Sequence, residues 1–245
     1  MVRKRLDRLL VEKGLAPTRQ RAQALILSGR VYIDETCRNK AGALVAEDSN
    51  VTVKGDLPFV SRGGLKLSAA LSSFSVSVAG LVCLDVGAST GGFTDCLLQN
   101  GARLVIAVDV GYGQFAWKLR QDPRVFLLER TNIRYLSPAA LPCPARLAVI
   151  DVSFISLRLV IPAVLKLVVP GAHILALVKP QFEVGKGEVG KKGVVRDPAK
   201  HEKVLENIKA FAGSLGLLLA GQVPSPVPGP EGNREFFMFF KSGPN

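Results

Sequence analysis

The sequence predicts an α/β protein whose main part is a Rossmann-like, doubly wound sheet of seven mostly parallel strands. Short apolar runs alternate with helical patterns from Leu81 onward, which is typical of such a sheet. The first run is followed by a glycine-rich turn, GASTGG, at residues 87–92. The second run ends in Asp109, about 20 residues beyond that turn, where a carboxylate can bind a ribose.

The larger part of the chain contains one strand or helix after another. Strands are expected at 81–86, 103–109, 124–128, 146–151, 172–178, 217–223 and 235–241. Helices are expected at 62–73, 92–99, 114–120, 137–141, 157–168 and 199–215. The aromatic run at 236–240, FFMFF, could also form a base-stacking platform, but a short continuous apolar run favours an inner strand.

A small α/β module precedes this sheet. Helical spacing predicts helices over 3–13 and 19–27, and β-branched residues predict strands at 31–33 and 51–53. We therefore expect a first domain at 1–56, a linker at 57–61 and a second domain at 62–245.

Composition points to a polyanionic partner. The 245 residues have a net charge of +12 and a pI near 9.8, which favours nucleic acid over an anionic membrane. A merely basic soluble surface is the alternative. Four scattered cysteines form no metal or disulfide pattern, and no export signal or membrane span is evident. We expect a cytoplasmic protein without a metal.

The first domain has eleven basic and seven acidic residues, and its basic residues are concentrated in the two helices and the turn after them. A basic RNA-binding face and a merely solvated helix surface are both compatible with this charge. The segment RLDRLLVEKGLAPTRQRAQALILSGRVYID resembles the RNA-binding module of ribosomal-protein-S-four type. With that resemblance, the predicted RNA-binding residues are Arg3, Lys4, Arg5, Arg8, Arg19, Arg21, Arg30 and Arg62.

The glycine turn favours one kind of ligand. Ser89 occupies the position at which a dinucleotide-binding turn has its middle glycine, so a pyrophosphate fits poorly. A nucleoside without phosphates, such as S-adenosylmethionine, fits better, although a purely structural strand–turn–helix has the same pattern. A second Gly/Lys-rich segment at 183–196 superficially matches a phosphate-binding loop. Lys192 stands where the metal-binding Ser or Thr is needed, which argues against a triphosphatase.

Charged residues mark the ends of several apolar strands. Asp151 follows the fourth strand and Lys179 the fifth, at the edge where ligands bind in such sheets. Lys66, before the first strand, and Glu235, at the start of the last, could approach the same point. A structural Asp–Lys ion pair is the alternative to a catalytic group.

These residues give the chain a family resemblance. The four residues are similar to the Lys-Asp-Lys-Glu tetrad of FtsJ-type ribose 2'-O-methyltransferases. The whole chain resembles the TlyA (haemolysin A) family of ribosomal RNA methyltransferases, through the motifs SRGGLKL, DVGASTGGFTD, VDVGYGQ, RTNIR, DVSFISL, LVKPQFE and GNREFF. The resemblance implies a class I methyltransferase fold and the catalytic residues Lys66, Asp151, Lys179 and Glu235. It also implies a donor site formed by Asp85, Gly87, Ser89, Gly91, Gly92, Phe93, Asp109, Asn132 and Asp151.

The resemblance further implies an activity and a partner. The expected reaction is S-adenosylmethionine-dependent 2'-O-methylation of a ribose, in a cytidine of ribosomal RNA or ribosomal subunits. A non-catalytic RNA-binding or ribosome-assembly protein is one alternative, and a haemolysin is another that the missing membrane span disfavours. The sequence leaves open the nucleotide, the subunit and the oligomeric state.

Overall fold

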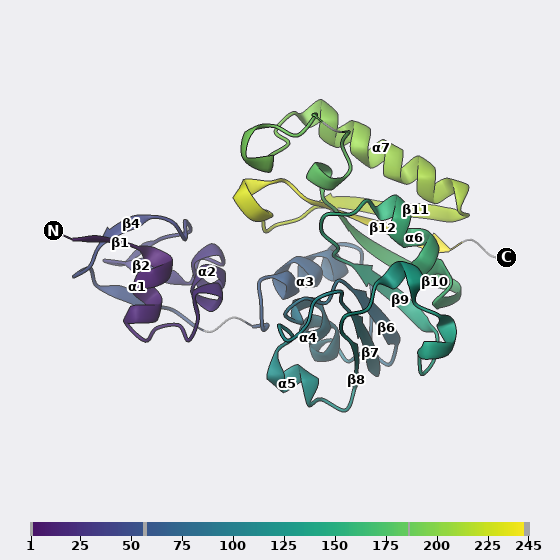
Figure 1. The fold of residues 1–245 in the computed structure, drawn as a ribbon, viewed down its shortest axis with the longest axis horizontal. Coiled ribbons are helices and arrows are strands. Elements are labelled where there is room, and N and C mark those ends of the chain that lie inside the picture. The colour runs from purple at the N-terminus through teal and green to yellow at the C-terminus, as the bar shows by residue number, and fades with distance from the viewer. Residues whose placement is uncertain (1, 56–57, 186, 243–245) are drawn as a thin grey trace.

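The computed structural model describes residues 2–55, 58–185 and 187–242, which form two domains side by side (Figure 1). The smaller domain contains β1 (Arg3–Arg5), α1 (Leu6–Glu12), α2 (Arg19–Leu27), β2 (Val31–Ile33), β3 (Thr36–Cys37), β4 (Leu44–Ala46) and β5 (Val51–Val53). Strands β1 and β4 pair with each other, and β2 pairs with both β3 and β5. Apolar side chains of α1 and α2, including Leu9 and Ile26, form its core.

The larger domain alternates strands and helices. Its strands are β6 (Val82–Val86), β7 (Leu104–Val108), β8 (Val125–Leu128), β9 (Ala145–Ile150), β10 (Val168–Val178), β11 (Leu217–Pro224) and β12 (Phe236–Ser242). Its α-helices are α3 (Gly63–Ser73), α4 (Gly92–Gln99), α5 (Trp117–Arg120), α6 (Leu157–Leu165) and α7 (Pro198–Ser214). Short 3-10 segments are η1 (Ile133–Tyr135), η2 (Pro138–Ala140), η3 (Pro180–Phe182), η4 (Lys191–Gly193) and η5 (Pro230–Gly232).

The seven strands form one sheet in the order β11-β12-β10-β9-β6-β7-β8. The five strands from β10 to β8 run parallel, while β12 is antiparallel to both of its neighbours. The chain goes from β6 outward to β7 and β8 and then returns to β9 on the other side of β6. The strand order therefore reverses between β6 and β9, where doubly wound sheets bind their ligands. The predicted fold class is confirmed.

Two apolar layers cover the two faces of the sheet. Along β12, Met238 and Phe240 pack with α6 and α7, whereas Phe237 and Phe239 pack with α3 and α4. Both faces of this strand are thus buried, as expected for an inner strand with a continuous apolar run. The aromatic run at 236–240 is an inner strand and not a base-stacking platform.

Some predicted boundaries are wrong. The expected helix over 3–13 begins only at Leu6, because residues 3–5 pair with 44–46 as a strand. The helix expected to reach residue 168 ends at Leu165, since Val168 already pairs with Ala145. The helix expected at 137–141 is the single 3-10 turn η2.

Three further expectations concern the chain as a whole. The predicted domain boundary at residues 56 and 57 lies outside the described residues, so the exact limits stay a prediction. Among the described residues, no helix is long and apolar enough to cross a membrane. Cys83 and Cys96 are free, buried thiols whose pKa values burial raises to about 12, as suits core residues.

Candidate active site

The glycine turn and the end of β9 are in direct contact at the point where the strand order reverses. Gly87, which follows β6, has a φ of +88°, and a Cβ there would lie 2.5 Å from the backbone oxygen of Asp151. The backbone N–H of Asp151 in turn donates to Val86 O over 2.9 Å. A side chain at position 87 is therefore excluded by conformation and by contact.

Two cavities meet at this contact. The larger, of about 510 Å³, extends toward α3, the segment after β10 and the segment before β12, and it includes Lys66, Lys179 and Glu235. The smaller, of about 350 Å³, extends toward the ends of β7 and β8 and includes Asp109 and Asn132. Both are lined by Gly87, Ser89, Asp151, Ser153 and Phe154. A group bound in one cavity can thus reach a group bound in the other beside Asp151.

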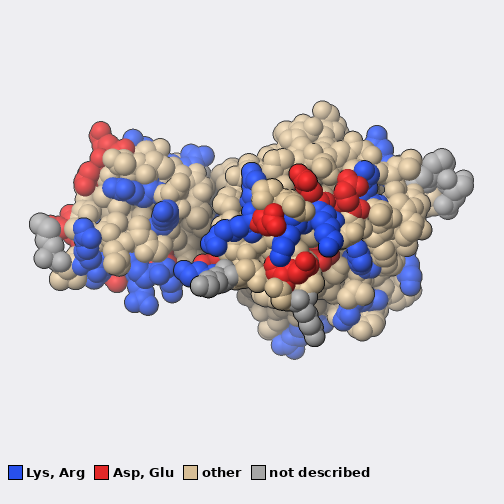
Figure 2. Space-filling model, turned by 90° about the horizontal axis from the view of Figure 1, so that it is seen from above, with Lys and Arg blue, Asp and Glu red and all other residues tan. Residues whose placement is uncertain are grey.

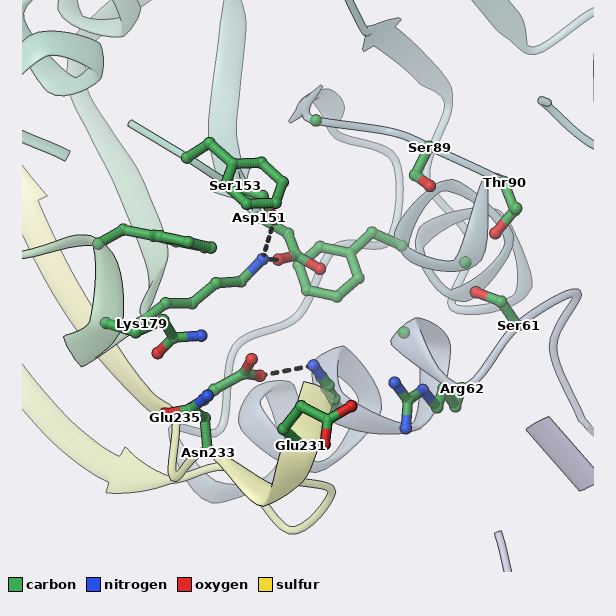
Figure 3. A pocket seen from close by; sticks show the side chains of 18 of the residues that line it. Ser61, Arg62, Ser89, Thr90, Asp151, Ser153, Lys179, Glu231, Asn233 and Glu235 are labelled. Carbon is green, nitrogen blue, oxygen red and sulfur yellow. Dashed lines mark hydrogen bonds and ion pairs between the residues drawn. The ribbon is translucent and has the colours of Figure 1, made fainter. Parts of the chain in front are cut away.

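Two ion pairs lie in the larger cavity (Figure 3). Lys179 Nζ is 2.6 Å from Asp151 Oδ1 and donates to Ser153 Oγ over 2.9 Å. Lys66 Nζ is 2.5 Å from Glu235 Oε2. The side chain of Asp151 is 21% exposed, whereas the other three charged side chains are almost fully buried.

The structure therefore brings the four predicted catalytic residues together, although each comes from a different region of the chain. The structural Asp–Lys ion pair that we considered as an alternative is present. It lines the junction of two cavities, so its presence does not argue against a catalytic role.

Arg62 adds a further positive charge to the larger cavity. Burial lowers the pKa of its guanidinium, while the negative charges of Glu235 and Asp151 act in the opposite direction. Within the described residues, the side chain of Arg62 forms no ion pair or hydrogen bond. A half-buried guanidinium without a partner favours the binding of an anionic group there.

The smaller cavity combines a carboxylate with apolar walls. Asp109 accepts hydrogen bonds from the backbone N–H groups of Ser89 (2.7 Å) and Gly111 (2.6 Å), which fix its orientation. Val110 and Ile133 line the same cavity. An apolar slot with one fixed carboxylate suits the base and the ribose of a nucleoside.

Not every predicted donor-site residue faces a cavity. Gly92 and Phe93 line the larger cavity. Asp85 and Gly91 line neither. Asp85 is fully buried and accepts from Thr94 Oγ1 over 2.6 Å, and burial raises the pKa of its carboxyl to about 7 despite this hydrogen bond. Gly91 adopts a φ of +92° against Leu119, so it shapes the turn from behind.

The predicted RNA-binding residues differ in their surroundings. Lys4 pairs with Glu12 and Glu47, and both Arg5 and Arg19 pair with Asp7. Burial acts to raise the pKa of Asp7, but hydrogen bonds from Arg5, Gln23 and Arg19 outweigh it and hold the pKa well below its usual range. Arg21 Nη1 donates to the carbonyls of Phe59 and Val60, and Arg30 Nη1 to that of Lys54. Arg3 and Arg8 are exposed.

Figure 2 shows how charge is distributed over one face of both domains. Lysine and arginine dominate the surface of the smaller domain there, with acidic side chains gathered near one corner. The larger domain shows blue and red side chains mixed together. Positive side chains are thus exposed on this face of both domains, and on the larger domain they lie among acidic ones.

Several cavity residues were not predicted. Ser153 and Phe154 directly follow Asp151, and Asn233 comes two residues before Glu235. Their position beside predicted catalytic residues is the one signal that could have identified them. Phe154 is 90% exposed with a φ of +63°, and its ring lies against that of Phe182 at 4.9 Å between centroids.

Family models match both parts of the chain. The one described as FtsJ-like methyltransferase matches residues 59–242. The chain belongs to this family. A second model, described as S4 domain, matches residues 4–51. The methyltransferase match contains both cavities and all four residues of the two buried ion pairs, and the S4 match falls within the basic smaller domain.

Individual proteins give similar results over nearly the full chain. The 16S/23S rRNA (cytidine-2'-O)-methyltransferase TlyA of Mycobacterium tuberculosis is 49% identical, covering 98% of this chain and 90% of the relative. Hemolysin A of Brachyspira hyodysenteriae is 36% identical, covering 96% and 99%. The solved structure of a "Putative hemolysin from Streptococcus thermophilus" aligns with a TM-score of 0.78 and 45% identity, covering 99% and 90%.

Proposed function

We propose that this protein transfers a methyl group from S-adenosylmethionine to the 2'-hydroxyl of a cytidine ribose in ribosomal RNA. The observation that carries the proposal is the Lys179–Asp151 pair at the junction of the two cavities. This junction is where a methyl donor in the smaller cavity meets an acceptor in the larger. The cytidine and the ribosomal RNA come from the names of the relatives.

The residues of the smaller cavity fit the donor. Asp109 would accept hydrogen bonds from the donor's ribose hydroxyls, and the apolar side chains of Val110 and Ile133 would enclose its adenine. Gly87 allows the donor to approach the backbone closely, because no Cβ fits there. When bound, S-adenosylmethionine supplies a methyl group made electrophilic by a positively charged sulfur.

Lys179 handles the proton in this mechanism. As the 2'-oxygen takes the methyl group that bound S-adenosylmethionine would supply, its hydroxyl proton would pass to the Lys179 amine. The resulting ammonium is stabilised by Asp151, 2.6 Å away, while the Ser153 hydroxyl holds the Nζ atom in position. Positioning of the hydroxyl and removal of its proton are thus provided by one side chain.

The second ion pair and Arg62 bind the acceptor. Lys66, fixed by Glu235, can donate to an oxygen of the target nucleotide from the opposite wall of the cavity. Arg62 lies beside them without an internal partner and is suited to an RNA phosphate. The basic smaller domain would capture the ribosomal RNA or a ribosomal subunit through further phosphates. We place the enzyme in the cytoplasm, where that substrate is made and where free thiols persist.

The test is methyl transfer from labelled S-adenosylmethionine to unmodified ribosomal subunits. Incorporated label should reside at 2'-O positions, recognised because those RNA linkages resist alkaline hydrolysis. We expect Lys179→Ala and Asp151→Ala to lose about 100-fold or more in rate, the range for a proton-transfer group. Lys209→Ala, which changes an exposed lysine of α7, is the control and should keep the wild-type rate.

Binding measurements separate the alternatives. Lys179→Ala and Lys66→Ala should keep donor affinity in calorimetry, because neither residue lines the smaller cavity. A wild-type protein that binds subunits but transfers no label would be an RNA-binding or assembly factor. Near wild-type turnover by Lys179→Ala would mean that the Lys179–Asp151 pair is only structural.

A further inference from the structure

One wall of the larger cavity is a loop that the catalytic mechanism above does not use. Residues 190–195 contain η4 and precede α7, and Lys192 and Gly193 line the cavity. Val194 and Val195, which follow, are buried, with only 5% and 3% of their surface exposed. The loop is therefore anchored at one end and reaches the cavity at the other.

Asn233 provides much of this anchoring. Its Oδ1 accepts from the backbone N–H of Val195 over 3.2 Å, and its Nδ2 donates to the backbone oxygen of Gly193 over 3.0 Å. The carbonyl of Val195 is contacted by His201 Nε2 at 2.8 Å. Asn233 is 4% exposed, so these hydrogen bonds form away from water, where an unmade one is costly.

The position of Asn233 in the chain gives this arrangement a consequence for the site. It stands two residues before Glu235, and both line the larger cavity (Figure 3). The same short segment thus holds the acid that pairs with Lys66 and the amide that holds the loop. Loop and acid are fixed to each other through residues 233–235.

Lys192 is the part of the loop that can meet a ligand. It is exposed and has a left-handed φ of +62°. Two residues before it, the backbone N–H of Gly190 donates to Val194 O over 3.2 Å. Among the described residues, no acidic side chain pairs with Lys192. An ammonium at the cavity mouth without a partner is suited to a phosphate.

We propose that Asn233 is a positioning residue that latches residues 193–195 and so holds Lys192 where its ammonium binds an RNA phosphate flanking the target ribose. The inference rests on the proposed function for the identity of the RNA. An amide is required because one group must accept from an N–H and donate to a C=O at the same time. No apolar side chain of equal size can do this.

The first test measures, in the absence of RNA, whether Asn233 holds residues 193–195 in place. In Asn233→Ala and in the volume-conserving Asn233→Leu, we expect hydrogen exchange at the Val195 amide to become about tenfold faster or more, since its acceptor is lost. S-adenosylmethionine affinity should stay within about twofold in both, because Asn233 does not line the smaller cavity. An unchanged exchange rate at Val195 in a folded variant would overturn the latch.

The second test couples the latch to Lys192 through binding of unmodified ribosomal subunits at several salt concentrations. Lys192→Ala alone should weaken binding about three- to tenfold and reduce the salt slope by about one, as for one lost phosphate contact. Lys192→Arg should restore most of the affinity.

The decisive comparison is the double variant. In an Asn233→Leu background, Lys192→Ala should cause little further loss, because its ammonium is already displaced. If the two losses simply add, or if Asn233→Leu binds subunits like the wild type, the proposal is wrong. Hydrogen exchange and subunit binding are both measured without methyl transfer. A wild-type protein that fails to methylate would therefore refute the proposed function, while the exchange rates and affinities would still test the role of Asn233.

Discussion

Asp85 and Asp109 end neighbouring strands, yet their surroundings give them opposite roles. Asp109 faces the smaller cavity and is held by two backbone N–H groups. Asp85 lies inside the protein with one hydroxyl partner, and one of its carboxyl oxygens has no hydrogen bond. Position at a strand end could be predicted from sequence for both, but the direction of each side chain could not.

Burial of Asp85 should make the stability of the protein depend on pH. Its folded pKa of about 7 is above the unfolded value, so the unfolded state loses this proton first as pH rises. The carboxyl therefore destabilises the fold progressively from about pH 4 to about pH 7. Asp85→Asn keeps an acceptor for Thr94. Its advantage over the wild type in free energy of unfolding should grow by about 2 kcal/mol from about pH 5 to about pH 8. Denaturant unfolding at the two pH values measures this; a gain independent of pH would contradict the assignment.

Asp109 should instead matter for ligand binding. Asp109→Ala removes the charged acceptor expected to bind the donor's ribose and should weaken S-adenosylmethionine by about 1.5–3 kcal/mol, the range for hydrogen bonds to charged groups. Calorimetry measures the change, with Asp122→Ala as the control, because Asp122 pairs with Arg124 and lines neither cavity. Unchanged affinity in Asp109→Ala would remove the smaller cavity as the donor site.

The sequence indicated the residues of the site better than their contacts. Lys66, Asp151, Lys179 and Glu235 stand in motifs at strand or helix ends, so their approach to one cavity could be anticipated. The bond from Lys179 to Ser153 and those of Asn233 to the 190–195 loop join segments far apart in the chain. Such contacts depend on how the segments pack, and no local pattern encodes them.

At the scale of elements, the turn after β6 depends on close contact with the end of β9. Glycine is needed at position 87 for its positive φ and for the 2.5 Å approach that a Cβ would make to Asp151 O. Gly80 also has a positive φ of +73°, but a Cβ there would meet nothing within 4 Å. Comparing the two positions therefore separates the free-energy cost of a positive φ from that of the steric clash with Asp151.

Substituting alanine at each position should give different results. Gly80→Ala should cost about 1–2 kcal/mol of stability, the penalty for a left-handed residue, and leave donor affinity unchanged. Gly87→Ala must also move the backbone of Asp151, so we expect a larger loss of stability and at least about tenfold weaker donor binding. Thermal unfolding and calorimetry test this pair. Equal effects at both positions would mean that the contact with Asp151 is unimportant.

Strong periodic patterns made most elements predictable, and strand β1 shows why some were missed. The apolar runs of β6, β7 and β10 are recognisable because both faces of each strand are buried. Strand β1 was missed because its sequence, RKR, has no apolar residue, and only its pairing with β4 makes it a strand. Pairing partners outweigh local preference in so short a segment.

At the scale of the whole molecule, the charges of the smaller domain are of two kinds. Lys4, Arg5 and Arg19 are bound to acids of the same domain and help to hold it together. Arg3 and Arg8 are exposed and form no ion pair within the part of the chain that the structure describes. The sequence showed an excess of positive charge but could not show which residues were already paired.

Neutralising the exposed pair should weaken RNA capture selectively. Arg3→Ala/Arg8→Ala should lower affinity for ribosomal subunits and reduce the log–log salt slope by up to about 0.7–0.9 per lost contact. Lys203→Ala/Lys209→Ala, which removes the same charge from exposed positions on α7, is the control and should have a much smaller effect. Binding of ribosomal subunits at several salt concentrations measures both effects. Equal salt slopes for the two double variants would mean that the basic face of the smaller domain is only a solvated surface.

The place of β12 determines when the molecule can become complete. This strand is the last of the chain, yet it inserts between β10 and β11, both of which are synthesised earlier. Until it is made, β10 has an unpaired edge, and Lys66 has no Glu235 to hold it. The acceptor side of the site therefore forms only after residue 235 and β12 have been synthesised, later than every other strand of the sheet.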